Sequence, residues 1–326
     1  MTLYFVVPED MGAPSGGNVY DRRICAALAA RGRAVREVAG AGALAALPDG
    51  AAVLMDGLVA CGVPEIVVPQ AARLRAGVLV HLPLADETGL PPDRAADLDA
   101  RERATLRAVR AVVATSGWGA RRLAARHGLE RVRVVRPGTD PAPLAPGTDG
   151  VSRLLCLGSV TPAKGQDVLV RALAGVADLP WTCELAGPLT RAPDHVARLR
   201  ALITGCGLDG RVHLTGVRPR ACLDTADLLV LPSRVETFGM VVTEALARGV
   251  PVLASDVGGV PEALGGAGLL APPDDVPALS AALRRWLTEP ALRTDLRASA
   301  RARRGTLDGW AEAARQLDAV LEQDLR

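Results

Sequence analysis

The stretch from Pro232 to Glu262 reads PSRVETFGMVVTEALARGVPVLASDVGGVPE, and it predicts the architecture around it. An apolar run, Leu228–Leu231, precedes it and has the length of a buried strand. A polar loop follows, and then a helical pattern over Met240–Arg248 that ends at Gly-Val-Pro. A second apolar run, Val252–Ser255, leads into a Gly-Gly turn. This order of strand, loop, helix and strand is typical of a parallel α/β sheet.

Two carboxylates flank the start of the predicted helix. Glu236 lies in the loop and Glu244 lies on the first turns of the helix. Backbone N–H groups near Gly239 and Met240 have no partner within the helix and lie at the positive end of its dipole. Such a position suits a phosphate, and a carboxylate on either side suits hydroxyl groups. The stretch therefore predicts a site for an anion that carries hydroxyl groups, such as a nucleotide-sugar.

The composition is that of a globular protein with two domains. The chain has 326 residues and a net charge of +2, which gives no general signal for nucleic acid or for a membrane surface. Its first residues, MTLYFVVPEDMG, are expected to form a strand rather than a signal peptide, because no basic segment precedes the apolar run. No apolar run approaches the ~20 residues of a transmembrane helix.

The cysteines favour a reducing compartment. They are scattered without a CxxC pair, and several lie in apolar runs: Cys25, Cys61, Cys156, Cys183, Cys206 and Cys222. Free thiols and a cytoplasmic location are therefore expected.

Lys164 is the only lysine of the chain, whose other cationic side chains are almost all arginines. It lies in a glycine-flanked turn between a predicted strand and a predicted helix. A single lysine there indicates a site that requires a compact ammonium rather than a planar guanidinium. Codon bias with chance placement is the alternative reading.

Strands and helices alternate along the whole chain, which predicts two parallel-sheet domains. Pro141–Gly150, rich in proline and glycine, reads as a linker. We therefore predict an N-terminal domain over residues 1–145, a C-terminal domain over 146–305 and a final helical segment over 306–326. The predicted strands are Leu3–Val7, Val35–Val38, Ala52–Met55, Gly77–His81, Ala111–Thr115, Val132–Val135, Arg153–Leu157, Trp181–Ala186, Val212–Thr215, Leu228–Leu231, Val252–Ser255 and Gly268–Leu270.

Two features of the N-terminal half are candidates for ligand contact. A loop with Gly12, Pro14, Ser15, Gly16 and Gly17 is expected between the first strand and a helix over Val19–Ala30. It lacks the GxGxxG dinucleotide fingerprint, so it is either a phosphate or sugar contact or only a tight turn. His81 ends a predicted strand at the carboxyl edge of the sheet, where it is either a sugar-hydroxyl partner or a structural cap.

Residues 94–136 are rich in arginine. They contain eleven arginines against four acidic residues. This composition predicts either a solvated helical face or a patch for an anionic lipid or an acidic acceptor.

Together these residues closely resemble the family 4 retaining glycosyltransferases of GT-B fold. The specific part is the spacing E-x7-E of Glu236 and Glu244, followed by Gly249-Val250-Pro251-Val252 and Gly258-Gly259-Val260-Pro261-Glu262. Weaker matches span the whole chain in the family's order. They are Gly16-Gly17, His81, the Ser116 region, Pro137-Gly138-Thr139-Asp140, Lys164-Gly165, Gly187 and Gly216.

The resemblance implies two Rossmann-like domains with a cleft between them and a last helix, Leu307–Leu325, that returns to the first domain. It implies donor binding on the C-terminal domain and acceptor binding on the N-terminal one. Glu236 would hold sugar hydroxyls, Lys164 would neutralise the diphosphate and His81 would contact the sugar near the reacting carbon. The implied donor-binding residues are Gly16, Gly17, Ser159, Gly187, Val217, Phe238, Gly239, Met240, Val241 and Glu244, of which Glu244 would hold the ribose and Val217 would lie near the base.

Ser159 departs from the family pattern, because an arginine usually stands there beside the phosphates. Either the leaving diphosphate is less neutralised or another arginine, Arg234 or Arg218, takes its place. The N-terminal domain is also short for this fold, and the resemblance therefore says least about the acceptor site.

The resemblance implies a retaining transferase that moves a sugar from a nucleoside diphosphate sugar to a hydroxyl of a small molecule, lipid or glycan. No metal and no cofactor are expected, and no nucleic acid partner. A GT-B epimerase or phosphorylase and a non-catalytic glycan-binding relic remain alternatives. A dinucleotide oxidoreductase is disfavoured by the missing GxGxxG. The donor base, the sugar, the acceptor and the oligomeric state are left open.

Overall fold

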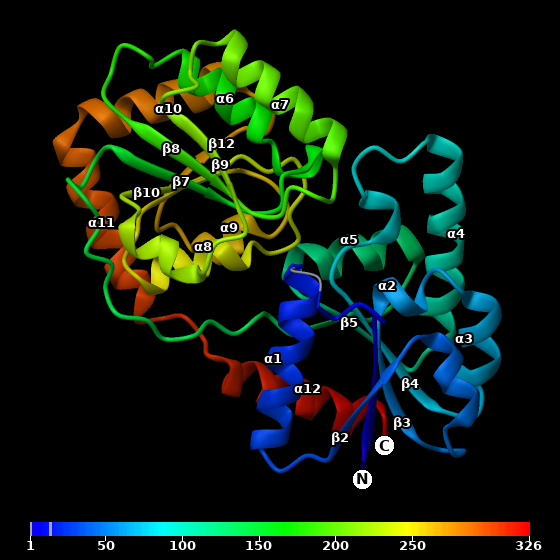
Figure 1. The fold of residues 1–326 in the computed structure, drawn as a ribbon. Coiled ribbons are helices and arrows are strands. Elements are labelled where there is room, and N and C mark those ends of the chain that lie inside the picture. The colour runs from blue at the N-terminus through cyan, green and yellow to red at the C-terminus, as the bar shows by residue number, and fades with distance from the viewer. Residues whose placement is uncertain (1, 13–14) are drawn as a thin grey trace. The chain divides into compact units, whose positions relative to one another are not determined.

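The computed structural model describes residues 2–12 and 15–326, and Figure 1 shows its fold. It divides into two compact units. Unit 1 comprises the chain up to Gly138 together with Asp308–Arg326, and unit 2 comprises Thr139–Leu307. Each unit contains one six-stranded sheet, and the paired strands are parallel. The predicted class of two parallel-sheet domains is confirmed, and the chain returns to unit 1 for its last helix.

The sheet of unit 1 has the strand order β2-β1-β3-β4-β5-β6. Its strands are β1 (Leu3–Val7), β2 (Val35–Ala39), β3 (Ala52–Asp56), β4 (Arg75–Val80), β5 (Ala111–Ala114) and β6 (Arg133–Val134). Its helices are α1 (Gly16–Ala30), α2 (Gly57–Ala60), α3 (Pro64–Ala71), α4 (Pro92–Ala108), α5 (Gly117–His127) and α12 (Trp310–Asp324), with 3₁₀ turns η1 (Ala41–Ala46) and η2 (Leu84–Asp86).

Both faces of this sheet are covered, so its central strands read as continuous apolar runs. In Figure 1, α1 and α12 lie together on one face, and α3, α4 and α5 lie on the other. The predicted glycine-rich loop is wrong at Gly16 and Gly17, which form the first turn of α1. The reason is local, because the Ser15 side chain accepts a hydrogen bond from the Asn18 N–H (3.0 Å) and caps the helix three residues before the predicted start. Pro14 lies outside the described residues.

The sheet of unit 2 has the strand order β12-β11-β10-β7-β8-β9. Its strands are β7 (Arg153–Leu157), β8 (Thr182–Ala186), β9 (Val212–Gly216), β10 (Leu228–Leu231), β11 (Val252–Ser255) and β12 (Leu269–Ala271). Its helices are α6 (Gln166–Ala174), α7 (Pro193–Gly205), α8 (Met240–Ala247), α9 (Val260–Leu264), α10 (Val276–Thr288) and α11 (Pro290–Arg304), with 3₁₀ turns η3 (Pro162–Lys164) and η4 (Arg220–Thr225).

Two hydrophobic cores form on opposite faces of this sheet. One joins β7 and β8 to α6, α7 and α10, with Trp286 fully buried at its centre. The other joins β10 and β11 to α8 and α9 and includes Phe238. Successive residues of a strand face opposite sides, so Leu229 belongs to the second core whereas Leu228 and Val230 belong to the first.

Two general expectations can be checked on the described residues. All six cysteines are free thiols, as predicted. Within residues 2–12 and 15–326, no helix combines the length and the apolar character that crossing a bilayer requires.

Candidate active site

In unit 2 the candidate residues collect where β7, β8, β9 and β10 end. Lys164 closes the turn η3 after β7, and Glu236 lies in the loop after β10. The Lys164 Nζ lies 2.5 Å from the Glu236 Oε2, and both side chains are largely buried. These two residues are 72 positions apart, and the parallel sheet brings them together because neighbouring strands end at one edge.

The glycines of the stretch from Pro232 to Glu262 hold the Glu236 loop in place. A Cβ on Gly258 would lie 1.7 Å from the Glu236 carbonyl oxygen, and one on Gly259 would lie 2.1 Å from that of Thr237. The Gly259 N–H donates to the Glu236 carbonyl (3.2 Å). The Gly-Gly turn therefore exists because the loop backbone packs directly on it.

The start of α8 is open to a ligand through its backbone. Gly239 has φ +89° and precedes the helix, and no side chain caps the first turn. Phe238 and Val241 are buried in the second core of unit 2, and Met240 packs against it. Their side chains therefore serve packing, and only their backbone groups remain for the predicted donor contact.

Three glycine turns interlock at the ends of β7, β8 and β9. The Gly187 N–H donates to the Gly216 carbonyl (2.8 Å), and a Cβ on Gly187 would lie 2.0 Å from the Gly158 carbonyl oxygen. Ser159 follows Gly158, and its carbonyl accepts from the Gln166 Nε2 (3.0 Å). Val217 follows the last of these turns and is 64% exposed.

Neither arginine proposed to replace the family's phosphate-side arginine is free to do so. The Arg234 guanidinium is bound by both carboxylate oxygens of Asp167 (2.8 and 2.9 Å) and by Asp274 (2.6 Å). The Arg218 Nε lies 3.1 Å from the Glu184 Oε1. The prediction that one of them neutralises the diphosphate therefore requires these ion pairs to break, just as a role for Lys164 requires its ion pair with Glu236 to open.

Glu244 is paired with a residue that the sequence reasoning missed. The Arg220 Nε lies 3.0 Å from the Glu244 Oε2, and the arginine is about half exposed. Arg220 opens the turn η4, three residues after Val217. The only available signal was its place just beyond a glycine-ended strand, which is weak on its own.

In unit 1, His81 follows β4 directly and is held by two carboxylates. Its Nε2 lies 2.8 Å from the Asp21 Oδ1 and 3.6 Å from the Asp56 Oδ2. Asp21 is on α1 and Asp56 ends β3, so the unit brings Gly17, Asp21, Asp56 and His81 together. Sequence reasoning missed both aspartates, although Asp56 gave the same signal as His81, a polar residue at the end of a buried strand.

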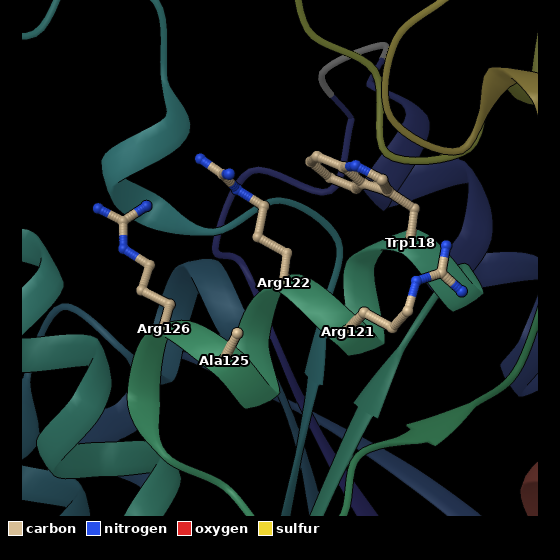
Figure 2. Close-up of a pocket in the computed structure, with 5 residues that line it drawn as sticks. All are labelled: Trp118, Arg121, Arg122, Ala125 and Arg126. Atoms are coloured by element: carbon tan, nitrogen blue, oxygen red, sulfur yellow. The ribbon is translucent and has the colours of Figure 1, made fainter.

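An open groove lies along α5 in unit 1. Its volume is about 690 Å³, and it is lined by Trp118, Arg121, Arg122, Ala125 and Arg126. Figure 2 shows Trp118, Arg122 and Arg126 projecting from one side of the helix, as their four-residue spacing requires. The Arg122 guanidinium lies 5.4 Å from the centre of the Trp118 ring and is bidentate to Asp86, and Arg126 contacts both Asp86 and Asp99.

Comparison with known proteins shows which family the chain resembles. Residues 148–303, which contain Lys164, Glu236 and the whole opening stretch, match the family model described as glycosyl transferases group 1. This part of the chain is similar to that family. The match covers the unit that carries the candidate donor residues, and the predicted recognition as a glycosyltransferase family member is confirmed.

Curated relatives of this chain are D-inositol 3-phosphate glycosyltransferases. That of Catenulispora acidiphila is 34% identical over 272 residues, covering 75% of this chain and 64% of the relative. That of Jonesia denitrificans is 34% identical over 221 residues, covering 60% of this chain and 52% of the relative. The chain thus spans between half and two thirds of the length of these relatives.

Solved structures confirm the predicted GT-B fold. Sucrose-phosphate synthase of Thermosynechococcus elongatus superposes with a TM-score of 0.82 at 22% identity, covering 99% of this chain and 98% of that one. HepE of Anabaena, solved in complex with UDP-glucose, has a TM-score of 0.81 at 20% identity, covering 99% of this chain and all of that one.

Proposed function

We propose that this protein transfers a sugar, with retention of configuration, from a nucleoside diphosphate sugar to an acceptor hydroxyl. The observation that carries the proposal is the pairing of the only lysine with Glu236 beside the uncapped start of α8. A cation, free backbone N–H groups and two carboxylates at one sheet edge suit a diphosphate that carries hydroxyl groups. The family match over this unit and the UDP-glucose complex of HepE support the donor class.

The chemistry follows from the charge that develops on the leaving group. As the bond between the anomeric carbon and the phosphate oxygen breaks, negative charge grows on the diphosphate. The Lys164 ammonium and the N–H groups at the start of α8 would stabilise it without a metal. The leaving phosphate would accept the proton of the acceptor hydroxyl as the new glycosidic bond forms, and Glu236 and Glu244 would hold sugar and ribose hydroxyls.

The test of the donor site is a thermal-shift panel of UDP, GDP, ADP and TDP, each with and without its sugars. A bound nucleotide raises the melting temperature by mass action. One base is expected to stand out, and that compound then serves in turnover assays. A flat result across the panel would remove the donor proposal.

For the acceptor we propose a polyol that carries a phosphate or another anionic group, bound through the α5 groove. The relatives' printed substrate, D-inositol 3-phosphate, supports this class. The groove is lined by three arginines and an indole, which suit a small anion better than a neutral glycan, provided that the anion replaces Asp86 and Asp99 as the partners of Arg122 and Arg126. The double variant R122Q/R126Q is expected to raise the acceptor KM at least about tenfold and leave the donor KM unchanged.

The matched control is Arg94→Gln, since Arg94 is also ion-paired, to Asp97, but lies outside the groove. It should leave both KM values unchanged. An equal rise of the acceptor KM in R122Q/R126Q and in Arg94→Gln would show that the effect comes from general surface charge.

Contact of residues 94–136 with an anionic membrane is a second candidate. At least seven of the eleven arginines are ion-paired within the protein, which weakens the field they present: Arg94, Arg101, Arg103, Arg122, Arg126, Arg131 and Arg133. Co-sedimentation with vesicles that contain phosphatidylserine distinguishes the two, because only the membrane proposal predicts salt-sensitive binding to them.

The other activities make separate predictions. An epimerase would isomerise a nucleotide-sugar without an acceptor, a phosphorylase would need orthophosphate and no nucleotide, and a relic would bind without turnover. The six free thiols favour a cytoplasmic location for the transferase. The independence from metal and cofactor stays a prediction, tested by turnover in the presence of EDTA.

A further inference from the structure

The cluster around His81 places more negative charge in the interior than a single imidazole balances. Asp21 is fully buried and Asp56 is 2% exposed, yet both approach the same ring nitrogen of His81. Burying an uncompensated carboxylate costs several kcal/mol, so such groups bind protons or cations. The two carboxyl groups and the imidazole of this cluster are therefore expected to bind protons together.

The hydrogen bonds within the cluster are unequally shared. The Asp56 Oδ1 accepts from the Leu58 N–H (2.5 Å), and the Asp21 Oδ1 is bound to His81. The remaining oxygen, Asp21 Oδ2, is buried and has no hydrogen-bond partner among the described residues. An unsatisfied buried carboxylate oxygen beside a second carboxyl group is the arrangement in which one proton is shared between the two.

The imidazole is fixed from the side that faces the carboxylates. A Cβ on Gly17 would lie 3.1 Å from the His81 Cδ2, so any other residue there would require the ring to shift by a few tenths of an ångström. The edge of Tyr20 meets the ring at a centroid distance of 5.1 Å, and Tyr20 is itself anchored by Trp310 and by the Val135 carbonyl. With Nε2 committed to Asp21, the ring can offer a ligand only its Nδ1.

Tyr20, Cys25 and Cys61 are titratable groups packed near this cluster. Burial raises the pKa of the Tyr20 phenol far above its usual value, so it stays neutral. Burial likewise raises the pKa of the Cys25 and Cys61 thiols, and the charges of Glu37 and Asp21 on Cys25 and of Glu102 and Asp56 on Cys61 raise it further. Burial lowers the pKa of His81, but the charge and hydrogen bond of Asp21 and the charge of Asp56 outweigh it and leave the pKa raised.

We propose that Asp21 and Asp56 are positioning residues that fix the His81 tautomer with Nε2–H toward Asp21 and keep a second proton on Nδ1, so that His81 presents an N–H donor to an anionic or hydroxyl oxygen of the ligand. This inference deepens the proposed function, since it rests on His81 as a substrate contact. Asp21 and Asp56 are not part of the Gly16-Gly17 and His81 pattern by which the sequence resembles the family. The proton stays on the ring and no bond other than hydrogen bonds forms.

The test is a pH titration of the four histidines in protein carrying ¹³C-labelled histidine, followed by NMR and assigned by His81→Gln. His81 is expected to titrate clearly above the ordinary value of about 6.5 and to show its Nε2–H tautomer once neutral. In Asp21→Asn its midpoint is expected to fall by about one pH unit or more. The exposed Asp49→Asn, which removes a carboxylate of unit 1 outside this cluster, should change nothing.

Several results would overturn the proposal. A wild-type midpoint at or below 6.5 would do so without any variant, which keeps the test decisive if Asp21→Asn does not fold. An unchanged midpoint in folded Asp21→Asn or Asp56→Asn would also refute it, as would loss of the titration on adding Zn²⁺ at micromolar concentration. The titration needs no substrate, so its failure is distinguishable from failure of the glycosyltransferase proposal. A second readout is the alkaline limb of kcat/KM, which should move to lower pH in Asp21→Asn.

Discussion

Replacing Glu236 with Gln is expected to raise the affinity for a bare nucleoside diphosphate and to lower the affinity for the complete donor. Without ligand, the Lys164 ammonium is occupied by the Glu236 carboxylate at 2.5 Å. A nucleoside diphosphate must displace that carboxylate from the ammonium and has no sugar hydroxyl to which the carboxylate could hydrogen-bond instead. A nucleoside diphosphate sugar provides such hydroxyl groups. The ion pair therefore lowers the affinity for the nucleoside diphosphate product but not the affinity for the donor.

The size of the effect follows from the burial of the pair. The Lys164 side chain is 28% exposed and that of Glu236 15%, which lies between a surface ion pair and a buried one. A net contribution of about 1–2 kcal/mol is reasonable for this setting. Since 1.4 kcal/mol is a factor of ten, Glu236→Gln should bind the bare diphosphate roughly 5- to 30-fold more tightly. The donor should lose a comparable factor with its carboxylate contacts.

Isothermal titration with the base chosen by the thermal-shift panel measures both affinities. Glu289→Gln is the matched control, because Glu289 is also ion-paired in unit 2, to Arg285, and lies on the surface. Unchanged affinity for the bare diphosphate in Glu236→Gln, with binding lost in Lys164→Ala, would refute the competition. Wild-type binding in both variants would show that the diphosphate lies elsewhere.

Three further results are expected. Lys164→Ala should lower kcat more than about tenfold, because it removes charge stabilisation at the leaving group, and a normal kcat would exclude the assigned role. Gly165→Ala should lower the free energy of unfolding by about 2 kcal/mol or more, since φ is +64° and a Cβ would lie 2.0 Å from the Pro232 carbonyl oxygen; Gly205→Ala, which meets no atom, serves as control in denaturant melts. Burial raises the pKa of Asp56 to about 7, so the folded state holds a proton that the unfolded chain releases near pH 4. Stability should therefore fall as pH rises from about 4 to 7, and melting of Asp56→Asn across this range should show a flatter profile.

The sequence predicted the strands well because both sheets are covered on both faces. Leu228–Leu231 and Val252–Ser255 are β10 and β11 with the predicted bounds, since a strand buried on both sides is an uninterrupted apolar run. The first helix was predicted to begin at Val19, because Gly16 and Gly17 suggest a loop. The cap that overrides this is one hydrogen bond, which the Asn18 N–H donates to the Ser15 side chain and which composition does not reveal.

The partners of the candidate residues were much less predictable. The pattern selected Lys164 for its rarity and Glu236 for its spacing, but it did not show that they form one ion pair. Asp21 was not selected at all, because it lies on the inner face of α1, where an apolar residue is the usual choice. Such pairings depend on which strand ends are neighbours, and the strand order is a property of the fold rather than of any local window.

The Gly-Gly turn at Gly258 and Gly259 packs against the Glu236 loop, so distant parts of the stretch from Pro232 to Glu262 depend on one another. The turn lies more than twenty residues after Glu236, yet a single Cβ at either glycine would overlap the backbone of the Glu236 loop. The glycines are therefore as important for the position of the Glu236 carboxylate as the residues beside it in sequence. Since Glu236 in turn holds the Lys164 ammonium, an alanine at Gly258 would displace a carboxylate and a cation of the candidate donor site together.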